Sequence, residues 1–283
     1  MQQYPSVVLK LSGHRAVIEP DRWTPGAYTL VVGGTSQSHV NLIDPTKLFF
    51  EYIQRMSKFI DLVGAHTQKL KVLHLGAGAL TIPRYIEATL PGSSQLVVEL
   101  EPDLYELVKQ QLPWPNPEMV SVRFNDARQG VVKLASENAR FDLIVVDVFS
   151  GSRIPAHVTS REFYESVRAI TLPQGVVLVN VADGAPLNFA RSQAATLEHV
   201  FGNLIAAGEE GVVLGKRYGN IVLAASQTPF DPAWAAHLSA AGPHPSRIVS
   251  NSELEFWIGS AEVVTDKSAS PSPPPAMTTF RLS

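Results

Sequence analysis

The chain has 283 residues, of which 45% are hydrophobic, and a formal net charge of −3. This composition is typical of a folded globular protein, and without a basic excess we expect neither nucleic acid nor a membrane surface as a partner. The sequence contains no cysteine, which excludes disulfide bonds, thiolate metal ligands and a cysteine nucleophile. No apolar run approaches the roughly 20 residues that span a bilayer, and the N-terminus lacks a signal-peptide pattern, so we expect a cytoplasmic protein.

The first 45 residues predict a small β-strand region. Residues 7–43 alternate apolar and polar side chains, with glycine-containing turn signals between the runs. Asp44 followed by Pro45 is typical of a helix N-terminus. We therefore expect a helix over about 46–63, in which apolar residues recur at intervals of three and four and bury one face.

From residue 71 to about 226, apolar strands alternate with amphipathic helices, which is typical of an α/β fold with a mostly parallel sheet. Strands are predicted near 71–75, 95–99, 120–124, 142–147, 175–181, 210–215 and 219–225, and helices near 79–89, 102–112, 127–137, 160–170 and 188–200. The short turn before the last strand predicts an antiparallel pair at the end of the sheet. We expect a seven-stranded, doubly wound sheet.

The pattern divides the chain into three parts. Residues 1–45 form the N-terminal β-strand region, and 46–265 form one α/β domain that ends in one or two further helices. The tail, 266–283, is rich in proline and serine and lacks the apolar residues for a core of its own. We expect this tail to be disordered or extended.

A glycine turn after the first strand of the α/β region is the first candidate for a ligand site. Gly76 and Gly78 follow a largely apolar run over 72–75. Glycine lets the backbone approach a ligand closely, and we favour this interpretation over a turn needed only for packing. Thr81 stands where the dinucleotide fingerprint requires its third glycine, which disfavours NAD.

Acidic residues follow the next three strands. Glu99 ends the second strand, where a carboxylate can accept two hydrogen bonds from a ribose diol; a solvated acid is the less favoured alternative. Asp126, beside the small Ala127, can accept from an adenine amino group or can equally cap the helix that begins at Arg128. Asp147 ends the fourth strand, where burial would raise its pKa toward the range of a general base.

Other polar residues give weaker signals. The histidines are scattered without the spacing of metal ligands, and His74, inside a strand, is expected in the core. Ser150-Gly151 does not form a G-x-S-x-G elbow. We therefore expect no metal and no serine hydrolase.

The order of these motifs resembles the spermidine synthase (polyamine aminopropyltransferase) family, a branch of the class I methyltransferase-like (Rossmann-like) fold. The resemblance covers about 28–226. It is carried by Leu-Val-Val-Gly-Gly-Thr-Ser-Gln at 30–37, Leu-Gly-Ala-Gly at 75–78, Val-Val-Glu-Leu-Glu at 97–101, Asn-Asp-Ala at 125–127, Phe-Asp-Leu-Ile-Val-Val-Asp at 141–147 and Tyr-Gly-Asn-Ile-Val-Leu at 218–223.

The resemblance implies a transferase of polyamine biosynthesis that uses decarboxylated S-adenosylmethionine as co-substrate and a small-molecule amine as acceptor. Asp147 would be the base that deprotonates the attacking amine, and no metal is needed because the leaving group is cationic sulfur. The resemblance also implies a homodimer. The residues that would hold the co-substrate are Gln37, Gly76, Ala77, Gly78, Glu99, Leu100, Asp126 and Ala127.

The chain departs from the family pattern where the family binds cations. Ala79 replaces an aspartate that grips the aminopropyl ammonium, and Ser150 replaces one that holds the acceptor amine. Phenylalanines at 49–50 replace a tyrosine–histidine or tyrosine–glutamine pair, which leaves Tyr52, together with Ser150 and Tyr218, as candidate substrate contacts. Burying an ammonium without a carboxylate is costly, so transfer to putrescine does not follow from the resemblance.

Three functional hypotheses follow. The first, which we favour, is an aminopropyltransferase-like enzyme. The second is a methyltransferase that uses S-adenosylmethionine; Ala79 favours it, because an aspartate there would repel the carboxylate of that donor. The third is a catalytically degenerate homologue that binds a nucleoside and serves as a regulatory or scaffolding dimer.

Overall fold

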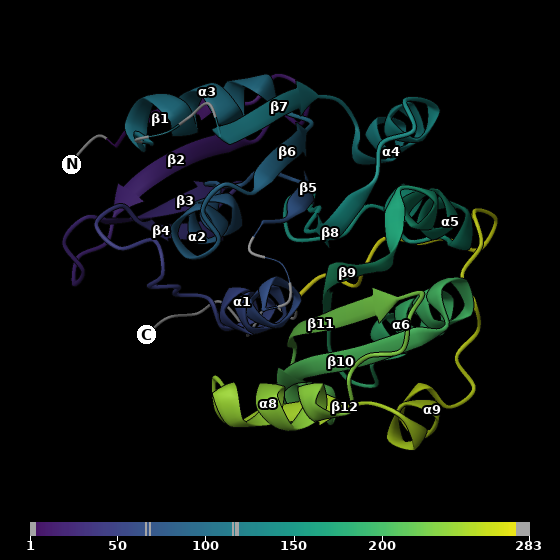
Figure 1. Cartoon of the computed structure of the whole chain (residues 1–283). Helices are drawn as coiled ribbons and strands as arrows, with labels where there is room; N and C mark the ends of the chain where they lie inside the picture. The colour runs from purple at the N-terminus through teal and green to yellow at the C-terminus, as the bar shows by residue number, and fades with distance from the viewer. Residues whose placement is uncertain (1–3, 66, 68, 115, 117–118, 276–283) are drawn as a thin grey trace.

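The computed structural model describes residues 4–65, 67, 69–114, 116 and 119–275 (Figure 1). It contains two sheets. The smaller is antiparallel, in the order β1-β2-β3-β4, and precedes the larger one in the chain. Its strands are β1 (Ser6–Val8), β2 (Arg15–Pro20), β3 (Ala27–Val32) and β4 (Thr35–Asn41).

The larger sheet has eight strands in the order β12-β10-β11-β9-β8-β5-β6-β7. These are β5 (Lys71–Leu75), β6 (Ser94–Glu99), β7 (Val120–Phe124), β8 (Phe141–Val146), β9 (Thr171–Asp183), β10 (Asn203–Glu209), β11 (Gly219–Ser226) and β12 (Ser246–Val249). Strands β5 to β9 pair in parallel, whereas β11 runs antiparallel between β9 and β10. The expected doubly wound α/β sheet is therefore confirmed, with one strand more than the seven predicted.

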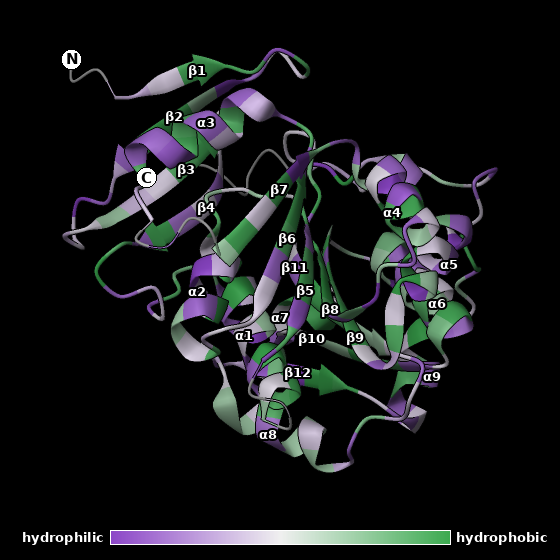
Figure 2. Ribbon diagram, turned by 45° about the horizontal axis from the view of Figure 1, so that its top comes forward, coloured by the Kyte–Doolittle hydropathy of each residue, from purple (hydrophilic) through white to green (hydrophobic). Residues whose placement is uncertain are grey.

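Helices cover both faces of the larger sheet (Figure 2). One face packs against α1 (Glu51–Gly64), α2 (Thr81–Thr89) and α8 (Ala233–Ala241). The other packs against α4 (Ala127–Ser136), α5 (Arg161–Ala169), α6 (Asn188–Phe201) and α9 (Ser252–Ile258). Alternation along the strands supplies both cores: in β9, Val176 and Leu178 face the α1 layer, while Val177 and Val179 face the α6 layer.

The small sheet packs against α3 (Pro102–Gln111) and the start of α2 through a third apolar cluster. Glu101, just before α3, fixes this arrangement: its carboxylate accepts from the backbone N–H groups of Leu11 and Ser12, at 3.3 and 2.7 Å. A break between domains at residue 45 stays a prediction. None of the helices in the described ranges is long and apolar enough to cross a membrane.

Two element predictions are wrong. The strand predicted at 210–215 is a short helix, α7 (Glu210–Val213), whose first turn is capped by Glu209, which accepts from the N–H of Val212 at 2.9 Å. The strand that precedes β11 in the chain and pairs with it is β10, whose Ala-Ala-Gly centre gives only a weak strand signal. The helix expected from residue 46 begins at Glu51, because Asp44 closes a separate turn by accepting from Thr46.

The C-terminal part of the chain is more ordered than expected. Residues 227–265 contain the edge strand β12 as well as α8 and α9. The tail predicted to be disordered or extended is fixed over 266–275: Ser272 is fully buried and exchanges hydrogen bonds with the backbone of Ile154. The yellow segment in Figure 1 shows its path from α9 past α5 toward α1. Residues 276–283 of that prediction lie outside the described residues.

Candidate active site

A cavity of about 550 Å³ lies at the carboxyl ends of the parallel strands. Its floor comes from the residues that follow β5 to β8, where open α/β sheets bind ligands. The small sheet contributes one wall through 35–38, and α1 contributes another through 50–55. A cavity of this size accommodates a nucleoside-sized ligand.

The two turn glycines line this cavity, but the chain itself also requires them. Gly76 has φ +93°, and a Cβ there would lie 2.4 Å from the carbonyl oxygen of Asp147. Gly78 has φ +50°, and a Cβ would lie 2.3 Å from the Ser38 hydroxyl. Packing therefore explains both glycines. Contact of this turn, including Ala77, with a ligand stays a prediction.

Glu99 is fixed beneath the turn. It is 6% exposed, and its carboxylate accepts from the backbone N–H groups of Ala77 and Glu101, both at 2.8 Å. Burial raises the pKa of Glu99, against the opposing effect of these hydrogen bonds. Each oxygen accepts one of these bonds and can accept another, and Glu99 lines the cavity. The neighbouring Leu100 also lines the cavity and is 47% exposed.

Asp126 caps α4, as one of its two interpretations predicted. Its Oδ1 accepts from the N–H groups of Arg128 and Gln129, at 3.0 and 3.1 Å. Its Oδ2 lies 2.7 Å from Nε2 of His157, which also lines the cavity. Ala127 lies beside it and is 6% exposed. The contact with an adenine amino group stays a prediction.

A β-bulge directs Gln37 toward the cavity. In the pairing of β3 with β4, Leu30 lies opposite Ser38 and Val31 lies opposite Ser36, so Gln37 is the extra residue. Its side-chain amide donates to the carbonyl oxygen of Gly151 at 2.6 Å. The small sheet is thereby joined to the loop that follows Asp147.

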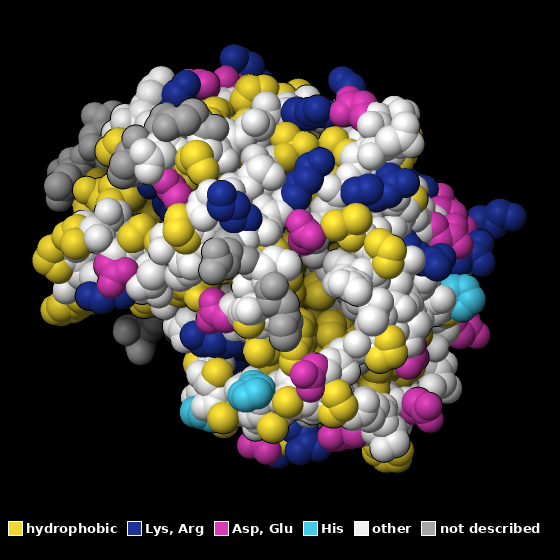
Figure 3. All heavy atoms as spheres, viewed as in Figure 1, with side chains coloured by type: hydrophobic (Ala, Val, Ile, Leu, Met, Phe, Trp, Pro, Cys, Tyr) yellow, Lys and Arg dark blue, Asp and Glu magenta, His cyan; other side chains and the backbone are white. Residues whose placement is uncertain are grey.

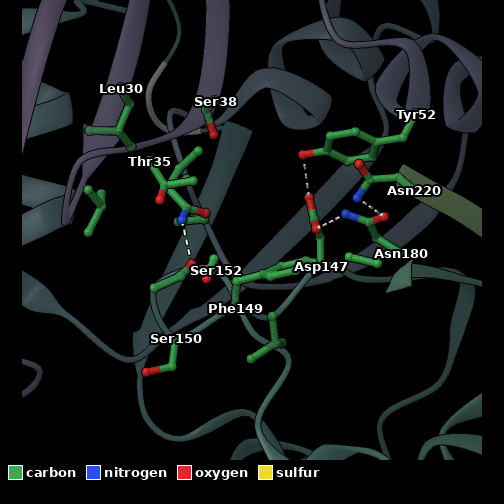
Figure 4. Close-up of a pocket in the computed structure, with 18 of the residues that line it drawn as sticks. Leu30, Thr35, Ser38, Tyr52, Asp147, Phe149, Ser150, Ser152, Asn180 and Asn220 are labelled. Atoms are coloured by element: carbon green, nitrogen blue, oxygen red, sulfur yellow. Dashed lines mark hydrogen bonds between the residues drawn. The ribbon is translucent and has the colours of Figure 1, made fainter. Parts of the chain in front are cut away.

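Asp147 is the centre of a hydrogen-bond network that spans three elements (Figure 4). Its Oδ2 accepts from the hydroxyl of Tyr52, in α1, at 3.2 Å, and its Oδ1 accepts from the Asn180 amide, in β9, at 2.8 Å. The side-chain amide of Asn220, in β11, donates to the side-chain oxygen Oδ1 of Asn180 at 2.9 Å. Burial raises the pKa of Asp147, and the two donated hydrogen bonds partly offset that rise.

The two amides were not predicted from the sequence. Asn180 interrupts a run of valines and leucine in β9, and Asn220 precedes the apolar residues of β11. A polar side chain inside a strand that is otherwise apolar on both faces is the signal that could have found them. Alternation places both on the α1 face, the side from which Tyr52 reaches Asp147.

Of three further residues that the motifs singled out, Ser150 and Tyr218 line the cavity and Ala79 does not. Ala79 is fully buried among apolar residues between the small sheet and α3 and does not line the cavity. Ser150 lies at the rim and is exposed, with its hydroxyl pointing away from Asp147 (Figure 4). Tyr218 lines the cavity, but its hydroxyl donates to the carbonyl oxygen of Pro273 at 3.3 Å.

His74 is a core histidine, as predicted. It is 2% exposed, and its Nε2 lies 2.9 Å from the side-chain amide oxygen, Oε1, of Gln95. Burial lowers the pKa of His74 from 6.5 to about 4, so the ring is neutral near pH 7.

Charge elsewhere on the molecule is dispersed. Basic and acidic side chains are both scattered over the face seen in Figure 3. In the part of the chain that the structure describes, no three histidine, aspartate or glutamate residues are grouped as metal ligands would be.

The chain is similar to several known proteins. No protein-family model matches the chain. The polyamine aminopropyltransferase of Vibrio vulnificus is 24% identical over 156 residues, which is 55% of this chain and 50% of that protein. The crystal structure of a probable spermidine synthase from Corynebacterium glutamicum superposes with a TM-score of 0.84 and 26% identity, covering 100% of both chains. The chain is spermidine synthase-like.

Two further facts bear on this spermidine synthase-like assignment. The chain spans about half the length of the polyamine aminopropyltransferases that it matches, 50% for the Vibrio protein. Human methyltransferase-like protein 13, solved in complex with SAH, superposes with a TM-score of 0.55 at 18% identity, over 83% of this chain and 98% of that chain. That second likeness is a likeness of fold.

Proposed function

We propose that the protein transfers an aminopropyl group from decarboxylated S-adenosylmethionine to a small-molecule amine. The observation that carries this proposal is the half-buried Asp147 carboxylate, held by Tyr52 and Asn180 at the edge of a nucleoside-sized cavity. The likeness to a probable spermidine synthase over the full chain supports it.

The donor half of the cavity comprises Gln37, Gly76, Glu99 and Asp126. We propose that it holds the methylthioadenosine part of the donor, with the ribose hydroxyls donating to Glu99. Because two backbone N–H groups already fix this carboxylate, little side-chain entropy is lost when the ribose binds. Ala77, Gly78, Leu100 and Ala127 complete the walls around the nucleoside.

The acceptor half comprises Tyr52, Asp147, Asn180 and Asn220. The amine first loses a proton to Asp147, whose raised pKa makes it a stronger base than an exposed aspartate. Its nitrogen then forms a bond to the aminopropyl carbon attached to sulfur. The carbon–sulfur bond breaks, its electron pair neutralises the sulfonium, and methylthioadenosine leaves. The reaction written in this way needs no oxidant, reductant or metal.

The other hypotheses lose support. Ala79 favours a methyltransferase only where an acid at that position would face the donor, but its side chain lies in an apolar core outside the cavity. A degenerate, non-catalytic protein does not require Asp147 to be oriented by two donated hydrogen bonds. We also propose that the protein is a homodimer and is located in the cytoplasm.

Calorimetry with three ligands tests the donor. We expect decarboxylated S-adenosylmethionine and methylthioadenosine to bind, and intact S-adenosylmethionine to bind more weakly than the decarboxylated form. Preference for intact S-adenosylmethionine would favour the methyltransferase hypothesis. No binding of any of the three would overturn the nucleoside site itself.

A further inference from the structure

The wall of the cavity next to Asp147 carries uncharged polar groups. Asn180 and Asn220 present carboxamides from β9 and β11, and Tyr52 presents a phenol from α1 (Figure 4). The phenol is uncharged near pH 7, because burial and the neighbouring carboxylate hold the pKa of Tyr52 well above its ordinary value. This wall offers hydrogen bonds but no second negative charge.

The other acids that line the cavity are bonded within the chain. Glu209 accepts from the Arg217 guanidinium at 2.8 Å, and Glu51 accepts from Arg55 at 3.1 Å, so each charge is matched. The remaining acids, Glu99, Glu101 and Asp126, accept from backbone N–H groups. Of the acids in the described lining, only Asp147 has neither a cationic side chain nor a backbone N–H as partner.

Asn220 retains unused hydrogen-bonding capacity. One of its N–H groups donates to Asn180, and its side chain is absent from the buried, unsatisfied polar groups of the described residues. A carboxamide has two donors and a carbonyl acceptor, so a further N–H and the carbonyl oxygen are available to a ligand in the cavity. Such a group suits a hydroxyl, which both donates and accepts.

We propose that the acceptor is a primary amine with a single positive charge and an uncharged hydrogen-bonding group, such as an amino alcohol. The ammonium lies against Asp147, and the distal hydroxyl bonds to Asn220. A diamine would bring a second ammonium against carboxamides, where it loses water without gaining a carboxylate. This inference rests on the proposed aminopropyl transfer, because it takes Asp147 as the group that receives the amine.

Aminobutanol and putrescine form a matched pair that tests the acceptor, since they differ only in the terminal hydroxyl or amine. Calorimetry measures each amine on wild-type protein saturated with methylthioadenosine. We expect aminobutanol to bind at least about tenfold more tightly, as an unmatched ammonium is strongly disfavoured out of water. Equal or tighter binding of putrescine, or no binding of either amine, would overturn the inference.

Turnover separates this inference from the proposed function. With decarboxylated S-adenosylmethionine present, methylthioadenosine release should be faster with aminobutanol than with putrescine. If aminobutanol binds with the expected preference but no methylthioadenosine forms with either amine, aminopropyl transfer fails while the acceptor preference stands. Faster turnover with putrescine would overturn the acceptor preference while supporting aminopropyl transfer.

A pair of variants tests the role of charge. Asn220→Asp supplies the missing carboxylate with almost no change in size and should move the binding ratio about tenfold toward putrescine. Asn220→Ala removes the amide without adding charge and should not favour putrescine. Taking the ratio of the two amines cancels any disturbance of Asp147 that weakens both. An unchanged ratio in a folded Asn220→Asp protein would contradict the proposed placement of the distal group.

Discussion

The donor and acceptor halves of one cavity are built in different ways. In the donor half, backbone N–H groups of neighbouring turns hold the carboxylates of Glu99 and Asp126. In the acceptor half, side chains hold one another, in the chain from Asn220 through Asn180 to Asp147. The first arrangement follows from the fold, whereas the second depends on individual side chains. Acceptor specificity can therefore change while the nucleoside site is kept.

The largest expected effect lies in the acceptor half. Asp147→Asn should lower turnover by about 10²- to 10⁴-fold, the usual contribution of a general base, because the amine then keeps its proton. Methylthioadenosine release at saturating donor measures this. Affinity for methylthioadenosine should be retained, since Asp147 belongs to the other half. Wild-type turnover in the variant would show that another group accepts the proton.

Stability against pH tests whether the sheet face beneath the cavity is uncharged. The unfolded chain protonates His74 near pH 6.5, whereas burial lowers its pKa to about 4 in the fold. The contribution of the neutral His74 ring to the free energy of unfolding is therefore complete above pH 6.5. It is lost as the pH falls toward 4, by up to about 3 kcal/mol. In the His74→Gln variant, the free energy of unfolding measured with denaturant should fall by about 3 kcal/mol less than in the wild-type protein between pH 6.5 and 4. An identical dependence would mean that the pKa of His74 is the same in the folded and unfolded states.

The donor half should respond to Glu99→Gln. Affinity for methylthioadenosine should fall by about 1.5–3 kcal/mol, the range for hydrogen bonds to a charged group. Glu101→Gln is the matched control, because that carboxylate binds the backbone of the small sheet at Leu11 and Ser12. It should lower the unfolding temperature with less effect on affinity. Equal losses of affinity in the two variants would mean that Glu99→Gln acts by loosening the turn and not by removing a hydrogen bond to the ribose.

The smallest effect concerns the C-terminal segment, part of which contacts the cavity wall at Tyr218. Truncation after Thr265 removes the Asp266 carboxylate from Arg128, and Pro273 from Tyr218. We expect a loss of about 1–2 kcal/mol in unfolding free energy, since regained chain entropy offsets part of the lost hydrogen bonding. The KM for the amine should rise, while methylthioadenosine affinity stays. Unchanged stability would mean that the segment after Thr265 does not stabilise the fold, as expected for a disordered tail.

Much of the fold could be predicted from the sequence, because it follows from local patterns. The apolar runs of β5 to β9 and the glycine turn at Gly76 are continuous in the chain, and the structure confirms them. Strand β10 was missed because its centre is Ala206-Ala207-Gly208, and its place in the sheet comes from pairing with β11. Pairing between distant segments leaves no comparable local signal.

The site could be predicted only in part, for a related reason. Asp147 was found because it ends an apolar strand, but nothing in the sequence shows that Asn180 and Asn220 face it. Gln37 reaches the site through a bulge that depends on the pairing of β3 with β4. Ala79, in contrast, was singled out by its motif although its side chain lies in an apolar core. The position of a residue in a motif does not give the direction of its side chain.

The most direct test of the proposed transfer is to identify both products. The protein is incubated with decarboxylated S-adenosylmethionine and aminobutanol, and methylthioadenosine and the aminopropylated amine are quantified by mass spectrometry. We expect the two products in equal amounts, formed with wild-type protein and lost with Asp147→Asn. Formation of S-adenosylhomocysteine and a methylated amine from intact S-adenosylmethionine, with no methylthioadenosine from the decarboxylated donor, would contradict the proposed function.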